Sequence, residues 1–353
     1  MTLLYAEVPR FYAEVERAAD PALADRPVIV GGDPRKRGLV QSATLDALVD
    51  GVELGMPILE ALERCPGARV RRTDLRAYRE LSSRLRASFR RAAPRLEPAG
   101  LEAAYLDTER AGEDPEGLAR KLLREVRDTL HLPLRVGIAP VKFVAKLAAE
   151  EAGPEGIRSV GLQEVRAFLE PLPVARLPGV GPHTSAALRE LGIATVGDLA
   201  RHPRRPIEER LGNHGVALLA AAQGHGEARL RAAPHARSMS QESTLDPSER
   251  DVAVLEVRLA DLAGRLAAGL AREHLGARRV VLKVRYDDQE MVTRTRTLAR
   301  PVASTGDLAE LANALLRRTQ AGERAVRLLG LAAFQLGERP RDDRQLALFR
   351  EGE

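Results

Sequence analysis

The sequence predicts a multidomain protein that combines α/β and α+β regions. Apolar runs alternate with stretches of helical spacing through the first 165 residues, as in a domain whose helices cover a sheet. From Pro171 to about Arg231 the chain changes to short helical stretches separated by Gly-rich turns. After linker-like residues 232–235, the predicted order is strand, helix, strand, strand, helix, strand. With 353 residues, 44% of them apolar, the chain has room for two or three domains with cores of their own.

The individual elements follow from apolar spacing and from the residues that end each run. Strands are predicted where short apolar or β-branched runs occur, namely over residues 3–8, 26–30, 104–107, 134–138, 238–245, 279–287, 290–298 and 326–335. Helices are predicted where apolar residues recur every three or four positions, namely over 11–19, 58–64, 74–91, 115–130, 140–152, 251–273 and 305–319. The charged segment that follows Gly337 is predicted to be disordered.

Composition excludes several classes of protein. A single cysteine, Cys65, excludes a disulfide framework and a thiolate zinc site. The seven histidines show no metal-ligand spacing, and the basic loop over residues 31–38 lacks the Gly-Lys-Ser/Thr of a phosphate-binding loop. No signal peptide or long apolar run is present, so we expect a cytoplasmic protein without a membrane partner. A net charge of +5 is compatible with nucleic-acid binding.

Four blocks of sequence carry a resemblance. Residues 4–16 read LYAEVPRFYAEVE, residues 26–32 RPVIVGG, residues 99–107 AGLEAAYLD, and residues 136–148 VGIAPVKFVAKLA. Together they resemble the Y-family (DinB/UmuC-like) translesion DNA polymerases, which serve mutagenic DNA repair in the SOS response. The resemblance covers nearly the whole chain and implies a right-hand architecture. It implies a palm from 1–10 and 77–166, fingers from 11–76, a helix-hairpin-helix thumb from 167–232, a little finger from 236–337, and a tail from 338–353.

The positions that the family uses to bind metal are altered here. The first and second metal-binding Asp of the family correspond to Glu7 and Glu102, and its third acid corresponds to Ala103. Two-metal phosphoryl transfer needs a tight cluster of carboxylates, and a methyl group cannot ligate a hard cation. Tyr12 corresponds to the aromatic steric gate that excludes ribonucleotides. We therefore expect no intact catalytic set and no cofactor, with Mg²⁺ required only if Glu7 and Glu102 still support synthesis.

The positions that grip the incoming triphosphate are altered as well. The family's Tyr and Arg in the fingers correspond to Leu45 and Leu48, and its Lys in the palm corresponds to Gly153. Arginine serves a triphosphate through paired hydrogen bonds that leucine cannot offer. The sequence therefore predicts weakened or lost nucleotide binding.

A Gly-rich hairpin in the thumb region is predicted to contact DNA. Residues 177–184, LPGVGPHT, resemble a helix-hairpin-helix, in which the N–H groups at a helix N-terminus meet a DNA phosphate. The candidate binding residues are Gly179, Val180, Gly181 and Thr184. The alternative is an ordinary connector between two helices.

A basic sheet face is predicted in the little finger. Arg237, Ser238 and Ser240 resemble the start of the family's first little-finger strand. Basic side chains then alternate along the next two strands, so each pair lies on one face of its strand: Lys283 with Arg285, and Arg294 with Arg296. Two strands that both expose basic pairs favour a track for DNA phosphates over an ordinary solvated face.

The C-terminal tail carries a candidate clamp-binding peptide. Residues 345–349, QLALF, match the Gln-Leu-x-Leu-Phe peptide by which bacterial polymerases bind the sliding clamp. Apolar side chains on a charged tail are costly to leave in water, so we expect them to enter a pocket on a partner. The candidate residues are Gln345, Leu346, Leu348 and Phe349. The alternative is that this segment packs on its own domain.

The sequence is compatible with three functions. The altered sites most resemble the catalytically degenerate ImuB-type branch, which implies a DNA- and clamp-binding adaptor that brings an error-prone replicative-type polymerase to damaged DNA. The second is an active template-directed translesion DNA polymerase that uses Glu7 and Glu102. The third is a generic DNA-binding repair scaffold. We favour the adaptor from the sequence, and so expect no enzymatic activity of the chain itself.

Overall fold

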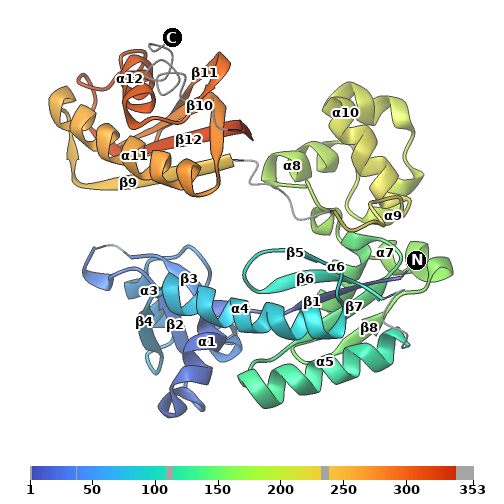
Figure 1. The fold of residues 1–353 in the computed structure, drawn as a ribbon. Helices are drawn as coiled ribbons and strands as arrows, with labels where there is room; N and C mark the ends of the chain where they lie inside the picture. Colours follow the sequence, from blue (N-terminus) through green and yellow to red (C-terminus); the bar gives the residue numbers. More distant parts are fainter. Residues whose placement is uncertain (1, 37, 109–113, 232–237, 339–353) are drawn as a thin grey trace, which may run out of the picture. The chain divides into compact units, whose positions relative to one another are not determined.

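The computed structural model describes residues 2–36, 38–108, 114–231 and 238–338 (Figure 1). The chain divides into two compact units, residues 1–233 and 234–353. The predicted combination of α/β and α+β regions is confirmed, and each unit has a hydrophobic core of its own. No helix among the described residues is long and apolar enough to cross a membrane.

A five-stranded sheet forms the centre of the first unit. Its order is β5-β6-β1-β7-β8, with bounds Leu96–Pro98, Ala103–Asp107, Leu3–Glu7, Arg135–Ala139 and Ile157–Ser159. Strand β1 pairs antiparallel with β6 and β7, so the N-terminal strand lies in the middle of the sheet. Three long helices pack on the sheet, α4 (Leu75–Ala92), α5 (Pro115–Leu130) and α6 (Lys142–Glu151).

Alternation along β1 distributes these helices over two faces. Leu4 and Ala6 share a core with apolar side chains of α4 and α5, so these two helices cover one face (Figure 1). Tyr5 and Ala103 belong to a second core that includes the apolar side chains of α6. Gly137 lets α6 lie directly on β7, because an added Cβ would come within 1.8 Å of the Ala145 carbonyl oxygen. Glu7, the last residue of β1, is on the same side of the strand as Tyr5.

A small three-stranded sheet completes the N-terminal part. Its order is β3-β2-β4, with bounds Val40–Ala43, Val28–Gly31 and Arg69–Arg72. The helices of this part are α1 (Phe11–Ala19), α2 (Leu45–Val49) and α3 (Ile58–Arg64), with 3₁₀ turns at Pro21–Leu23 and Pro34–Lys36. The sequence predicted β2, α1 and α3. It missed β3, β4 and α2, which are four or five residues long and too short to show a period.

Short helices follow the central sheet, as predicted. They are α7 (Val165–Leu169), α8 (Pro182–Glu190), α9 (Val196–Arg201) and α10 (Arg204–Ala222), with 3₁₀ turns at Leu162–Glu164 and Val174–Arg176. Their apolar side chains extend the core that covers α6. Helix α10 is interrupted at Gly212, whose φ of 60° and ψ of −151° are not helical.

The second unit has the predicted order of strands and helices. A four-stranded antiparallel sheet of order β11-β10-β12-β9 has bounds Met291–Val302, Leu275–Tyr286, Val326–Glu338 and Ser238–Glu249. Helices α11 (Val252–Arg272) and α12 (Thr305–Leu316) pack on one face (Figure 1). All four strands are longer than predicted. Their ends carry polar residues that alternate with the core positions, and a search for apolar runs stops too early there.

A buried lysine fastens the central sheet to the segment that follows α10. The Lys142 side chain is 8% exposed, and its Nζ lies 2.5 Å from Glu97 Oε2 and 3.3 Å from Glu227 Oε2. The backbone also joins these parts, because Lys142 N donates to the Glu227 carbonyl oxygen at 2.9 Å. Removing the ammonium group would leave Glu97 poorly exposed and without this counter-charge.

We therefore expect Lys142→Ala to lower the free energy of unfolding by about 3 kcal/mol, because one partner of a buried pair is lost. Urea denaturation measures the change. The control is Arg205→Ala, which breaks an i,i+4 pair whose side chains are 89% and 64% exposed and should have no measurable effect. Equal stability of the two variants would show that the Lys142 pair does not fasten the fold.

Candidate active site and nucleic-acid interface

A cleft of about 340 Å³ opens at the end of β1 in the first unit. Side chains from β1, α1, β3 and α2 line it, together with the residue that precedes β6. The cleft brings together four of the positions singled out in the sequence: Glu7, Tyr12, Leu48 and Glu102. The backbone places Glu102 there, because Val8 N donates to the Glu102 carbonyl oxygen at 3.0 Å.

Three cross-strand neighbours decide the chemistry beside this cleft. Glu7 is paired directly with Ala103 on β6 and with Arg135 on β7, so the three side chains form one row across the sheet. Arg135 Nε and Nη2 both donate to Glu7 Oε2, at 2.9 and 2.7 Å. The Glu7 and Arg135 side chains are only 14% and 19% exposed. The protein therefore supplies the counter-charge of Glu7 itself.

The donors present do not fit a pair of divalent cations. Ala103 contributes a methyl group to the row and Glu7 is held by Arg135. Among the residues that the structure describes, no group of three or more His, Cys, Asp or Glu side chains is placed to hold a metal ion. A two-metal centre needs several carboxylates around ions about 4 Å apart. Of the two acidic residues that line the cleft, Glu7 is paired with Arg135, and Glu102 has no ion pair among the described residues.

The positions expected to grip a triphosphate carry no charge. Leu48 lines the cleft, and Leu45 lines a neighbouring cavity of about 460 Å³ beside Pro154 and Glu155, which directly follow Gly153. Arg10 lines both cavities, but its Nε donates to Glu14 Oε1 at 3.3 Å. At the positions where the family is expected to bind the triphosphate, α2 therefore presents the apolar side chains of Leu45 and Leu48 to the two cavities.

Aromatic side chains near the cleft are packed and neutral. The Tyr12 ring stacks on Tyr78 with a centroid distance of 4.5 Å, and Tyr78 Oη donates to Glu16 at 2.7 Å. Burial, and next the charges of Glu97 and Glu7, raise the pKa of Tyr105 to about 12. Burial likewise raises the pKa of Tyr5. Neither phenol offers a base at neutral pH.

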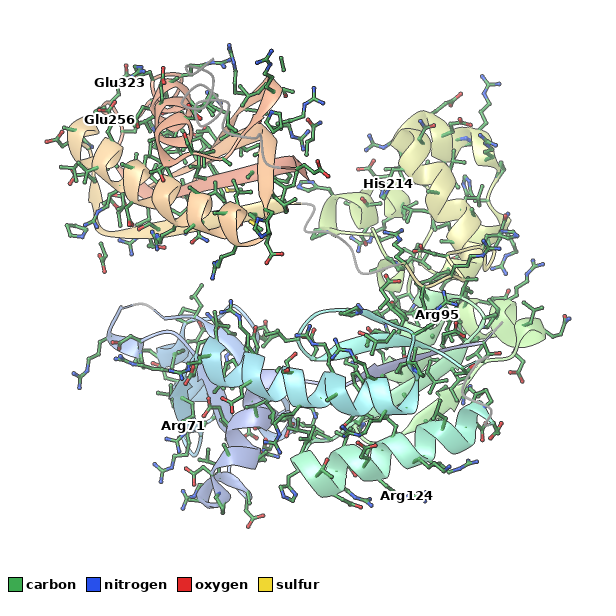
Figure 2. The ribbon with its side chains drawn as sticks, viewed as in Figure 1. Arg71, Arg95, Arg124, His214, Glu256 and Glu323 are labelled. Atoms are coloured by element: carbon green, nitrogen blue, oxygen red, sulfur yellow. The ribbon has the colours of Figure 1, made fainter. Side chains whose placement is uncertain are left out.

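The predicted hairpin is formed around the start of α8. Gly179 has a φ of 90°, and Gly181 is the N-cap of α8 without a side-chain cap. Ser185 N donates to the Gly181 carbonyl oxygen at 2.8 Å, so the N–H of Thr184 belongs to the open first turn. His214 of α10 was missed by the sequence analysis. Its Nε2 lies 3.1 Å from the Gly179 carbonyl oxygen and holds the hairpin. Figure 2 marks the position of His214.

The predicted single basic face on the second unit is wrong. In the β10–β11 hairpin, Arg294 is paired with Leu282 and Arg296 with Val280. The side chains of Leu282 and Val280 are buried under the helices. Arg294 Nε donates to the Arg318 carbonyl oxygen, just beyond the end of α12, at 2.7 Å. Residues opposite one another share a face, so Arg294 and Arg296 lie on the helix side of the sheet.

The other face, free of the two helices, carries Lys283 and Arg285. Across β12 and β9 it continues through Gly330 and Leu328 to Glu242 and Thr244. The same register places Ser238 and Ser240 on this face. We call this surface, Arg279, Lys283 and Arg285 with Ser238, Ser240, Thr293, Thr295 and Thr297, the open face.

Arg279 is a further basic residue of the open face that the sequence analysis missed. It is paired with Phe334 on β12, and its guanidinium carbon lies 5.0 Å from the centroid of that ring. The signal was present, since Arg279, Lys283 and Arg285 are odd-numbered residues of one strand. Among the described residues, Lys283 has one acidic partner on this face, Glu242 at 3.0 Å. The candidate Arg237 lies outside the described residues.

Comparisons with known proteins agree over nearly the whole chain. Residues 7–150 match the impB/mucB/samB family, residues 236–348 match the C-terminal domain of that family, and residues 163–193 match the IMS family HHH motif. A DNA polymerase IV of Methanoculleus marisnigri is 38% identical over 339 residues, which cover 95% of this chain and 94% of the relative. The chain belongs to the Y-family of DNA polymerases. A DNA polymerase IV of Halorhodospira halophila is 36% identical over 343 residues, covering 96% of each chain.

Solved Y-family structures resemble this chain as well. The Y-family DNA polymerase chimera Dbh-Dpo4(243-245)-Dbh has a TM-score of 0.86 and 25% identity, covering 96% of this chain and 100% of the chimera. The insertion ternary complex of Dbh DNA polymerase has a TM-score of 0.68 and 25% identity, with the same coverage. These similarities confirm the predicted Y-family architecture with its helix-hairpin-helix and its C-terminal little finger. The relatives are named DNA polymerase IV, so the ImuB-type branch stays a prediction.

Proposed function

We propose that this Y-family protein binds primer–template DNA during damage tolerance and translesion synthesis, and that its own palm does not catalyse nucleotide addition. One observation carries the catalytic half of the proposal: Ala103, Glu7 and Arg135 form a row where a polymerase needs clustered acids. The protein then serves as an adaptor for an error-prone polymerase of replicative type.

The names of the relatives favour a second candidate function. The curated relatives are called DNA polymerase IV, and one structural neighbour is an insertion ternary complex of a DNA polymerase. These names support a template-directed translesion polymerase and do not support an adaptor. Glu7 and Glu102 line the same cleft as Tyr12, so such an enzyme would have two carboxylates for Mg²⁺. The relatives and the side chains of the palm thus favour different functions.

Support for DNA binding comes from two surfaces that do not involve the palm. The first turn of α8 presents N–H groups and the positive end of a helix, which suit a phosphate. The open face presents three basic side chains among threonines and serines. Contacts of this kind position a protein on the backbone without reading sequence, so we propose binding with little sequence preference.

The proposed adaptor also needs partners. Gln345, Leu346, Leu348 and Phe349 lie outside the described residues, and their sequence supports a proposal that they bind the bacterial sliding clamp. We also propose the domain limits that the sequence indicated: a palm of 1–10 and 77–166, fingers of 11–76, a thumb of 167–232, a little finger of 236–337 and a tail of 338–353.

Binding and extension measured on one primer–template test the proposal. We expect the purified protein to shift the labelled duplex in a gel, and to leave the primer unextended with all four dNTPs and Mg²⁺ or Mn²⁺. The control is Glu7→Ala/Glu102→Ala, which should behave like the unaltered protein. Extension that this variant loses would establish the polymerase candidate. A fully paired duplex of the same length is measured beside the primer–template. If the protein binds both DNAs equally well and extends neither, the generic DNA-binding scaffold is the function that remains.

A further inference from the structure

We infer that Arg135 takes the place of the divalent cation at Glu7, so that the palm of this protein has a built-in counter-charge in place of a metal site. The inference concerns the same centre as the proposed function and relies on it only for the identity of the ligand positions.

The contact between Arg135 and Glu7 is strong and specific. Two guanidinium nitrogens donate to the same carboxylate oxygen, at 2.9 and 2.7 Å. Direct pairing of the two residues across β1 and β7 fixes this contact in the middle of the sheet. Hydrogen bonds between charged groups at such distances are about twice as strong as neutral ones. Both side chains are mostly buried, so water screens the pair less than it would at the surface.

A divalent ion at Glu7 would have to break this contact. An ion on Oε2 would displace the guanidinium group, which would then lie beside a doubly positive charge in a partly buried position. Like charges at such distances raise the free energy of the bound state. The neighbouring position cannot compensate, because Ala103 is 2% exposed and presents only a methyl group. Glu102 alone would remain as a further carboxylate in the cleft.

Two substitutions in the row of Ala103, Glu7 and Arg135 would restore a metal site. Arg135→Ser removes the competing charge and frees Glu7. Adding Ala103→Glu restores a third carboxylate beside Glu7 and Glu102, because residue 103 is the direct cross-strand neighbour of Glu7. The affinity of a site for hard divalent cations rises with the number of carboxylate oxygens that it offers. Leu45, Leu48 and Gly153 remain unchanged, so nucleotide addition need not return with the ion.

Titration with Mn²⁺ alone, followed by electron paramagnetic resonance, tests the inference on the full chain without DNA or nucleotide. We expect no Mn²⁺ site in the unaltered protein that depends on Glu7. The Ala103→Glu/Arg135→Ser variant should bind one Mn²⁺ at least about tenfold more tightly than any residual binding by the unaltered protein, and Glu7→Gln should remove this gain. Arg91→Ser/Ala103→Glu is the control, since it removes an arginine that pairs elsewhere, with Glu125, and should gain no site.

Two results would overturn the inference. One is a saturable Mn²⁺ site in the unaltered protein that Glu7→Gln removes. The other is a folded Ala103→Glu/Arg135→Ser variant that binds no more Mn²⁺ than the unaltered protein. If that variant does not fold, Arg135→Ser decides, because Mn²⁺ should raise its melting temperature and leave that of the unaltered protein unchanged; equal melting would contradict the inference. DNA and nucleotide are absent, so failure here leaves the DNA-binding proposal standing.

Discussion

Replacing Arg279, Lys283 and Arg285 by Ala should weaken primer–template binding about tenfold or more at moderate salt and flatten its salt dependence. The three side chains share the open face, and each released phosphate contact removes about 0.9 from the slope of log K against log salt. Lys283 has Glu242 as a competing partner, so we expect the slope to fall by about 2 rather than the full amount for three contacts. Fluorescence anisotropy at four or more salt concentrations measures both quantities.

The matched control lies on the same sheet. Arg294→Ala/Arg296→Ala removes basic side chains from β11, but the register places them on the side of the helices. This variant should keep the affinity and most of the salt slope of the unaltered protein. An equal loss in the two variants would mean that net charge, and not the open face, governs binding. Unchanged affinity in the triple variant would refute the open face as the phosphate track.

Replacing Leu348 and Phe349 by Ala should lower affinity for the bacterial sliding clamp at least about tenfold, because each side chain loses roughly 2 kcal/mol or more of apolar burial in a pocket. The melting temperature of the protein should stay unchanged, since these residues follow β12, the last strand among the described residues. Surface plasmon resonance with the clamp and a thermal melt measure the two effects.

Arg341→Ala/Arg344→Ala is the control for that measurement. It changes the same tail without touching the apolar residues and should bind the clamp nearly as well. Two outcomes would contradict the proposal that residues 345–349 are the clamp-binding peptide. One is clamp binding that survives the loss of Leu348 and Phe349. The other is a large fall in the melting temperature of that variant.

The success and failure of the sequence predictions have a common physical origin. Periodicity fixes the faces within one strand or helix, so α1, α3 and α5 were predicted to the residue. The pairing register of two strands depends on the length and geometry of the loop that joins them. The β10–β11 hairpin pairs odd-numbered residues with odd-numbered ones, as Lys283 with Thr293, and this sends Arg294 to the opposite face.

The decisive feature of the palm lay beyond sequence reasoning for a similar reason. The changes at Glu7, Glu102 and Ala103 are visible in one block or another of the resemblance. Arg135 looks like any arginine at the start of a strand, and it is 128 residues away from Glu7 in the chain. Only the placement of β1 between β6 and β7 brings the three side chains of the row together. His214 became part of the hairpin in the same way, through a contact 35 residues apart.

The rate of single-nucleotide incorporation, with the protein in excess over primer–template and with saturating dNTP, tests the central claim most directly. Under these conditions DNA binding does not limit the reaction, so the rate reports the chemistry of the palm alone. Removing one charge-stabilising group costs about 10²–10³ in rate, and several are missing here. We expect incorporation no faster than that of Glu7→Ala/Glu102→Ala with Mg²⁺ or Mn²⁺. Incorporation that this variant abolishes would contradict the claim and make the protein a working translesion polymerase.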